Sequence, residues 1–128
     1  MGHLGLLDDR GYPRVLPATF AMVGGAVWSA IDHKPKSRPG EDLTRVRWLR
    51  ARPQSTLTID RYDDDWTRLA WVQLIGTTAV VDVAGNDGVL AALADRYPQY
   101  RDRQPQGPLL RLDAERTVCW SASEEPLS

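Results

Sequence analysis

Residues 55–82 read STLTIDRYDDDWTRLAWVQLIGTTAVVD and carry the clearest strand pattern of the chain. In residues 55–61, apolar Leu57 and Ile59 alternate with polar side chains. Alternation with a period of two is typical of a strand that has one buried face and one polar face. The stretch therefore predicts a strand that covers an apolar core on one side only.

The second half of this stretch predicts more strand structure. Residues 62–65 have the composition of a turn. The apolar-rich residues 66–82 predict one long strand, or two strands bent at Gly76, with Trp71 on one of its faces. A glycine within such a run is typical of a barrel corner.

The beginning of the chain predicts three further strands. Residues 4–7 and 13–21 are apolar-rich and are separated by residues 8–11, which have the composition of a hairpin turn. A glycine pair then leads into a third strand at residues 26–31, so this part of the chain predicts a β-meander. Because a proline cannot donate to a strand ladder, Pro17 predicts an edge position, a bulge or a backbone that faces a ligand.

Two helices and a last strand complete the prediction. Residues 43–52 and 86–97 repeat apolar side chains at helical spacing, and each run stops before a proline. Residues 109–120 supply the last strand material, with a turn expected around residues 113–115. The fold class is therefore mainly β, with about six strands and two helices, and the glycine-marked bends favour a small closed or nearly closed barrel.

The composition predicts a single domain. The 128 residues are 42% hydrophobic, which suffices for one core and not for two. We expect residues 1–122 to form this domain and residues 123–128 to be a disordered tail. The 16 basic and 17 acidic residues give a net charge of -1, which argues against a general nucleic-acid binder.

Several features predict a cytoplasmic protein. Cys119 is the single cysteine, so no disulfide can form within the chain. The most apolar run, residues 20–28, is shorter than the roughly 18 residues that a membrane span needs. No charged segment precedes an apolar one at the start, as a signal peptide would require. We therefore expect no membrane partner.

A basic junction lies at residues 29–37, which read SAIDHKPKS. An apolar strand ends there, Lys34 and Lys36 follow on a proline-stiffened turn, and Ser37 adds a hydroxyl. The helix expected next would present free backbone N–H groups at its positive end, so the junction has the chemistry of a phosphate site. The alternative is a solvated turn followed by a helix cap, and the residues alone leave both interpretations open.

The helix expected after the junction is rich in arginine. Arg45, Arg47, Arg50 and Arg52 lie mostly outside its apolar face. Such side chains commonly form the outer face of an amphipathic helix. Because no acidic residue lies among them, they would also attract an anionic group beyond a first phosphate.

Other common sites find little support in the sequence. His3 and His33 are the only histidines, so a zinc site or a cysteine–histidine pair lacks partners. The glycine-rich nucleotide loops G-x-x-x-x-G-K-[ST] and G-x-G-x-x-G are absent. The carboxylates at residues 63–65 fit a solvated turn, so no metal site is expected.

The chain holds five tryptophans, and two of them fall within expected strands. Trp28 and Trp71 are interpreted first as core or interface anchors. Stacking on a flat ring is the second interpretation, and Trp71 is kept on that ground among the cofactor-binding candidates. Trp66 and Trp120 lie at strand ends, where they would cover a groove or contact a second subunit.

Four motifs resemble one known family, in the order that the family has them. They are AIDHKPK at residues 30–36, DRYDDDW at residues 60–66, RYPQY at residues 96–100 and CWSA at residues 119–122. Together they resemble the FMN-binding split-barrel superfamily related to pyridoxamine 5′-phosphate oxidase. Within it they are similar to the flavin and deazaflavin oxidoreductases whose cofactor is F420.

The resemblance implies a split β-barrel homodimer, with two equivalent cofactor sites at the subunit interface. Lys34, Lys36 and Ser37 would hold the cofactor phosphate, and Arg45 would meet the anionic oligoglutamate tail of F420, which FMN lacks. The remaining candidates would line the ribityl chain and the ring, or flank the ring, and are Ser29, Ala30, Ile31, Asp32 and His33, together with Val15, Leu16 and Pro17.

The implied function is an F420-dependent oxidoreductase. The reduced deazaflavin would deliver a hydride to an electron-poor small molecule, while the protein positions the ring and excludes water. No catalytic residue is assigned, because the cofactor carries the chemistry. The alternatives are an FMN-dependent oxidase or reductase of the same fold and a non-catalytic F420 carrier or storage protein.

Overall fold

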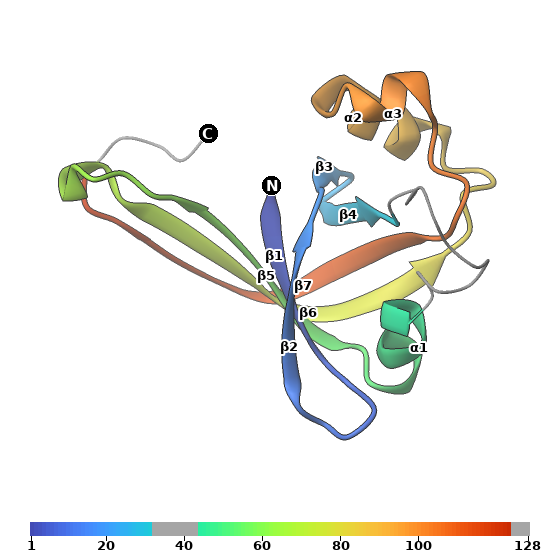
Figure 1. The fold of residues 1–128 in the computed structure, drawn as a ribbon, viewed down its shortest axis with the longest axis horizontal. Helices are drawn as coiled ribbons and strands as arrows, with labels where there is room; N and C mark the ends of the chain where they lie inside the picture. Colours follow the sequence, from blue (N-terminus) through green and yellow to red (C-terminus); the bar gives the residue numbers. More distant parts are fainter. Residues whose placement is uncertain (32–43, 124–128) are drawn as a thin grey trace.

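The computed structural model describes residues 1–31 and 44–123, which form one mainly antiparallel β structure with helices at its margins (Figure 1). The strands are β1 (Gly2–Leu7), β2 (Pro13–Ala18), β3 (Ala21–Val23), β4 (Ala26–Ala30), β5 (Gln54–Arg61), β6 (Ala70–Val81) and β7 (Leu109–Ser121). The helices are α1 (Thr44–Ala51), α2 (Asp87–Arg96) and α3 (Gln99–Asp102), and a 3-10 turn, η2, covers Trp66–Arg68. The predicted strand-rich class is confirmed, and α3 was not predicted.

The seven strands form one sheet in the order β2-β1-β5-β6-β7-β4-β3. Each neighbouring pair is antiparallel. The predicted meander is wrong, because the β1–β2 hairpin and the β3–β4 hairpin lie at opposite ends of the sheet order. Thr19 and Phe20 connect the two hairpins, and β2 does not pair with β3. The edge position predicted from Pro17 is confirmed, since β2 is the first strand in that order.

A β-bulge bends the long pair of strands β6 and β7. The pairing shifts register between Ile75, which faces Arg116, and Gly76, which faces Ala114. Glu115 is the extra residue of this bulge. The bend predicted at Gly76 is confirmed, but the turn predicted around residues 113–115 is wrong, because β7 runs through them without interruption.

The sequence placed the start of β6 too early. Trp66 lies in η2, and the strand begins at Ala70. The Asp65 carboxylate accepts a hydrogen bond from the backbone N–H of Thr67 at 3.1 Å, and thereby caps this turn. An aspartate that bonds to the backbone two residues ahead favours a turn over a strand.

Two apolar clusters fill the molecule. The first lies inside the curved sheet, where α1 adds Val46 and Leu49 to residues such as Leu4, Leu57 and Leu110. The second lies between α2 and the β3–β4 hairpin. It is built from Trp28, Leu90, Leu93, Tyr100 and Leu109. The helical spacing predicted for both helices is therefore confirmed, except that residue 43 lies outside the described residues.

Figure 1 shows β5, β6 and β7 running out together from the remaining strands to the turn that contains η2. This extension carries large apolar side chains on its surface, since Tyr62 and Trp66 are each 72% exposed and Trp120 is 47% exposed. Within the described residues, none of the helices is long and apolar enough to cross a membrane.

Candidate functional site

Two adjoining hollows run across the face of the sheet that points away from the first apolar cluster. One has a volume of about 470 Å³ and is lined by His3, Val15, Thr58, Asp60, Trp71 and Gln73. The other has a volume of about 570 Å³ and shares Val15 with the first; its lining includes Gly5, Pro13, Arg14, Thr56 and Ile75. We call the two hollows together the sheet groove.

The strand register explains which side chains line the first hollow. His3 on β1 pairs with Thr58 on β5, which pairs with Gln73 on β6. The Gln73 amide nitrogen donates a hydrogen bond to the Thr58 hydroxyl at 3.3 Å. Two pairs further along, Asp60 faces Trp71, and Trp71 faces Trp120 on β7. The hollow therefore combines a polar row with Trp71, whose cross-strand neighbour on β7 is Trp120.

Gly5 gives the second hollow a floor without a side chain. It pairs with Val15 on one side and Thr56 on the other. A Cβ atom at Gly5 would meet only the Thr56 carbonyl oxygen, at 3.6 Å, which is ordinary van der Waals contact. The space above Gly5 is thus open to a ligand rather than filled by the protein.

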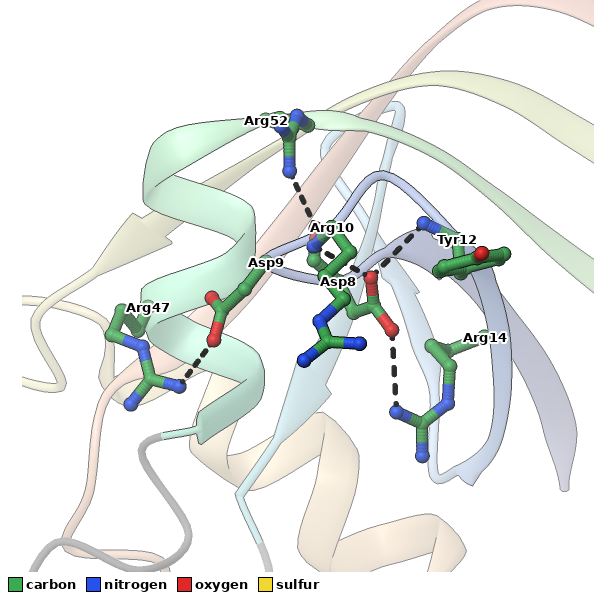
Figure 2. A network of polar contacts seen from close by, with 7 residues as sticks. All are labelled: Asp8, Asp9, Arg10, Tyr12, Arg14, Arg47 and Arg52. Atoms are coloured by element: carbon green, nitrogen blue, oxygen red, sulfur yellow. Dashed lines mark hydrogen bonds and ion pairs between the residues drawn. The ribbon is translucent and has the colours of Figure 1, made fainter.

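β2, which borders the sheet groove, contacts α1 through the Arg14 side chain. The Arg14 guanidinium lies 5.0 Å from the centre of the Trp48 ring, a cation–π arrangement. It also lies 3.5 Å from the Asp8 carboxylate (Figure 2). Trp48 belongs to α1, so β2, which borders the groove, is in contact with the arginine-rich helix.

Asp8 organises the turn between β1 and β2. Its carboxylate accepts hydrogen bonds from the backbone N–H groups of Arg10 at 2.9 Å and Tyr12 at 3.0 Å. Partial burial opposes ionisation of this carboxyl. The N–H groups of Tyr12 and Arg10, and then the Arg14 guanidinium, outweigh that effect and hold the pKa of Asp8 below its ordinary value of 3.8.

The arginines of α1 differ in their partners. Arg47 forms an ion pair with Asp9 at 3.0 Å, and Arg52 donates a hydrogen bond to the Asp8 carbonyl oxygen (Figure 2). Arg45 is half-buried and Arg50 is exposed. Neither forms an ion pair with any residue in the described parts of the chain. These two guanidinium groups therefore have more capacity left for an anion than Arg47 and Arg52 have.

The predicted site residues on β2 separate between two faces. Val15 lines the sheet groove and is 67% exposed, and Pro17 points to the same face, opposite His3. Leu16 packs instead against the first apolar cluster. Alternation along β2 thus leaves two of the three predicted ring neighbours available to a ligand, together with Trp71.

The predicted residues at the end of β4 are buried. Ala30 packs in the second apolar cluster, and Ile31 in the first. Ser29 faces a small internal cavity of about 20 Å³, and its hydroxyl has no hydrogen-bond partner among the described residues. In this chain their side chains therefore do not line the sheet groove.

The remaining predicted residues cannot be placed. Asp32, His33, Lys34, Lys36 and Ser37 lie outside the described residues. Their proposed part in phosphate binding stays a prediction.

Several residues of the sheet groove were not predicted from the sequence. His3, Gly5, Asp60 and Gln73 come from three strands that are distant in the chain. The alternation in β5 indicated that Asp60 points away from the core, but only the pairing of β1 with β5 brings His3 and Gly5 beside Thr58 and Thr56 on the same face. Within residues 1–31 and 44–123, no three His, Cys, Asp or Glu side chains gather where they could hold a metal ion.

Comparison with known proteins supports the fold assignment. No protein-family model matches the sequence, and a search of curated proteins returns no match. Solved structures do match. HutZ, the heme storage protein from Vibrio cholerae, has a TM-score of 0.70 and 18% identity over 94% of this chain and 84% of its own. A FAD-binding protein from Mesorhizobium loti has a TM-score of 0.65 and 18% identity over 92% of this chain and 83% of its own.

A third structure agrees with the other two. A Clostridium acetobutylicum protein of the pyridoxinephosphate oxidase family has a TM-score of 0.63 and 19% identity over 94% of this chain and 78% of its own. This chain has the split-barrel fold. The split barrel predicted from the four motifs is thereby confirmed, and the predicted homodimer and the F420 cofactor remain predictions.

Proposed function

We propose that this split-barrel protein is an F420-dependent oxidoreductase whose sheet groove receives the deazaflavin ring. The observation that carries the proposal is the open floor at Gly5, between Val15 and Thr56 in one hollow, with Trp71 lining the adjoining hollow. A flat aromatic ring needs an apolar surface without protruding side chains, and stacks well beside tryptophan.

The dimensions of the sheet groove fit such a group. Each hollow alone has a volume within the range of about 300–1,000 Å³ that is usual for small-molecule sites, with about 470 Å³ in one and 570 Å³ in the other. Gln73, Thr58 and Asp60 offer polar atoms that would orient the ring edge. When bound, the cofactor would supply hydride transfer to an electron-poor small-molecule substrate.

The charged parts of the cofactor would lie toward α1. Lys34, Lys36 and Ser37 would hold its phosphate, as the resemblance of the AIDHKPK motif implies. The oligoglutamate tail would reach Arg45 and Arg50, which form no ion pair within the described residues. The contact of Arg14 with Trp48 supports this direction, because it joins β2, which borders the groove, to this helix.

A second copy of the chain is the partner that we propose for the groove face. Val15 is 67% exposed and Trp120 is 47% exposed on that face, so both side chains have apolar surface left to bury against a partner. Two copies that meet there would bury these side chains and enclose the ring from the other side. Ser29, Ala30 and Ile31, whose side chains are buried, would then contribute mainly through their backbone, and Asp32 and His33 would line the ribityl chain and the ring as the resemblance implies.

FMN is the second candidate cofactor, and the likeness to a FAD-binding protein of the same fold supports keeping it. The two differ in the tail, since only F420 carries a chain of carboxylates for Arg45 and Arg50. The deciding experiment is an absorbance spectrum of the purified protein, followed by titration with each cofactor. Tighter binding of F420 than of FMN is expected, and the reverse order would overturn the assignment.

Turnover separates the enzyme from a carrier. Reduced F420 is mixed with the protein in a single-turnover experiment, and its oxidation is followed against a panel of enones and quinones. Oxidation with at least one acceptor is expected. Tight binding without oxidation of the cofactor by any acceptor would favour the carrier or storage function.

A further inference from the structure

We infer that Asp8 is a positioning residue that fixes the distance between the ring-binding and tail-binding parts of the proposed cofactor site. The inference rests on the proposed function. It assigns a role to a carboxylate that lies outside the sheet groove and has no direct contact with α1 through its own side chain. The contacts in Figure 2 carry the argument.

The Asp8 carboxylate closes the β1–β2 turn. It accepts the backbone N–H groups of Arg10 and Tyr12 and pairs with Arg14 at 3.5 Å. Its side chain is only 15% exposed, against 61% for the neighbouring Asp9. Hydrogen bonds from charged or N–H donors to a partly buried carboxylate restrict it more strongly than an exposed ion pair would.

The closed turn holds two contacts to α1 that matter here. Arg52 donates to the Asp8 carbonyl oxygen, and Arg14 lies over the Trp48 ring. The Arg47–Asp9 ion pair is exposed on both sides and contributes little. The first contact requires the Asp8 carbonyl to point at α1, and the second requires the Arg14 side chain to stay between Asp8 and Trp48. Both conditions depend on the turn that the Asp8 carboxylate shapes.

The two elements that Asp8 joins are those that carry the two parts of the proposed site. β2 continues from Arg14 directly to Val15 in the sheet groove, whereas α1 carries Arg45 and Arg50. A ligand that spans both parts gains affinity when they are held at the correct separation, because less conformational freedom is lost on binding. A ligand that occupies only one part gains nothing from that separation.

The test compares a spanning ligand with a fragment. Wild type, Asp8→Asn and the matched control Asp9→Asn are titrated with F420 and with the deazaflavin–ribityl core that lacks phosphate and tail. For Asp8→Asn we expect about tenfold weaker binding of F420, since a charged hydrogen-bond network is lost. We expect the affinity for the core to stay within about twofold, and Asp9→Asn to match wild type, because exposed ion pairs contribute little.

Hydrogen exchange gives a second readout that needs no ligand. In Asp8→Asn the amides of α1 and of the β1–β2 turn should exchange faster than in wild type, while those of β6 and β7 stay protected. Unchanged exchange in α1 would overturn the coupling, whichever cofactor the protein uses.

The outcomes separate the two proposals. If wild type binds neither F420 nor FMN, the proposed function fails and Asp8 has no role in such a site, although exchange still decides whether it couples the two elements. If wild type binds F420 and Asp8→Asn binds it equally well, the positioning role is wrong. If Asp8→Asn loses F420 and the core to the same extent, Asp8 acts only through general stability, which also refutes the inference.

Discussion

A Cβ atom at Gly76 would overlap the carbonyl oxygen of Asp113 on the neighbouring strand. Gly76 therefore sits where the bulge brings the backbones of β6 and β7 too close together for any side chain. We predict that Gly76→Ala lowers the free energy of unfolding by about 1–3 kcal/mol, since the clash is with backbone and must move a strand. Urea unfolding of the two proteins measures this difference. A wild-type midpoint for Gly76→Ala would show that the strands are not held at this separation.

At Gly5, in contrast to Gly76, we predict that substitution by alanine leaves the stability of the protein unchanged. An added Cβ meets nothing closer than the Thr56 carbonyl oxygen at 3.6 Å, so the protein should accept Gly5→Ala without loss of stability. The methyl group would instead stand on the floor of the sheet groove, and we expect F420 to bind about tenfold more weakly, which corresponds to about 1.4 kcal/mol. Isothermal titration measures the affinity.

Gly88→Ala is the control for this substitution, because no atom lies within 4 Å of its added Cβ and because Gly88 lies on α2, away from the groove. It should bind F420 as wild type does. Equal affinities of Gly5→Ala and wild type for F420 would show that the ring does not bind in the sheet groove.

Much of the fold followed from local patterns. The alternation of Leu57 and Ile59 with polar residues correctly predicted β5, and Gly76 marked the bend in β6. The turn expected at residues 113–115 failed because an Asp-Ala-Glu run has turn composition, while the structure absorbs it as a bulge at Glu115. Composition alone does not distinguish a turn from a bulge, since both need one irregular backbone position.

Only part of the sheet groove could be predicted from the sequence, because local patterns do not report which strands pair. Trp71 lies in a run whose alternation separates two faces, so it could be chosen from its own strand, whereas Val15 was named only from the family resemblance. His3 and Gly5 become neighbours of these residues only through the pairing of β1 with both β2 and β5. Strand pairing is set by long-range contacts, which a pattern within one segment does not report. Ser29 shows the converse, because its own strand β4 is buried on both faces.

The two lysines of the chain, Lys34 and Lys36, both lie in the proposed phosphate turn. Replacing each with alanine should weaken F420 binding by at least about tenfold per lysine, given about 1.5–3 kcal/mol for a hydrogen bond to a charged group. Titration at two salt concentrations measures the effect, and the loss should be smaller at high salt, where charge attraction is screened. Arg103→Ala removes a cation just after α3 and should leave the affinity unchanged. Wild-type affinity in both lysine variants would refute the phosphate site.

The lowered pKa of Asp8 also predicts how the stability of the protein depends on pH. Its pKa is lower in the folded protein than the ordinary value of 3.8, because the N–H groups of Tyr12 and Arg10 and the Arg14 guanidinium outweigh the opposing effect of burial. A carboxyl whose pKa falls on folding adds stability above its unfolded pKa, and this stability is lost as the pH falls through the folded pKa. The wild-type unfolding midpoint should therefore drop as the pH falls from about 5 to below 3.8.

Asp8→Asn should start from a lower midpoint at pH 7 and decline less over the same range, because its amide does not titrate. Asp9→Asn is the matched control, with the same charge change one residue away on an exposed side chain, and should keep the wild-type slope. Asp65, whose pKa is also lowered, mainly by its bonds from the Thr67 hydroxyl and N–H, contributes equally in all three proteins. Parallel pH curves for wild type and Asp8→Asn, measured by urea unfolding at each pH, would show that Asp8 does not hold the β1–β2 turn in its ionised form.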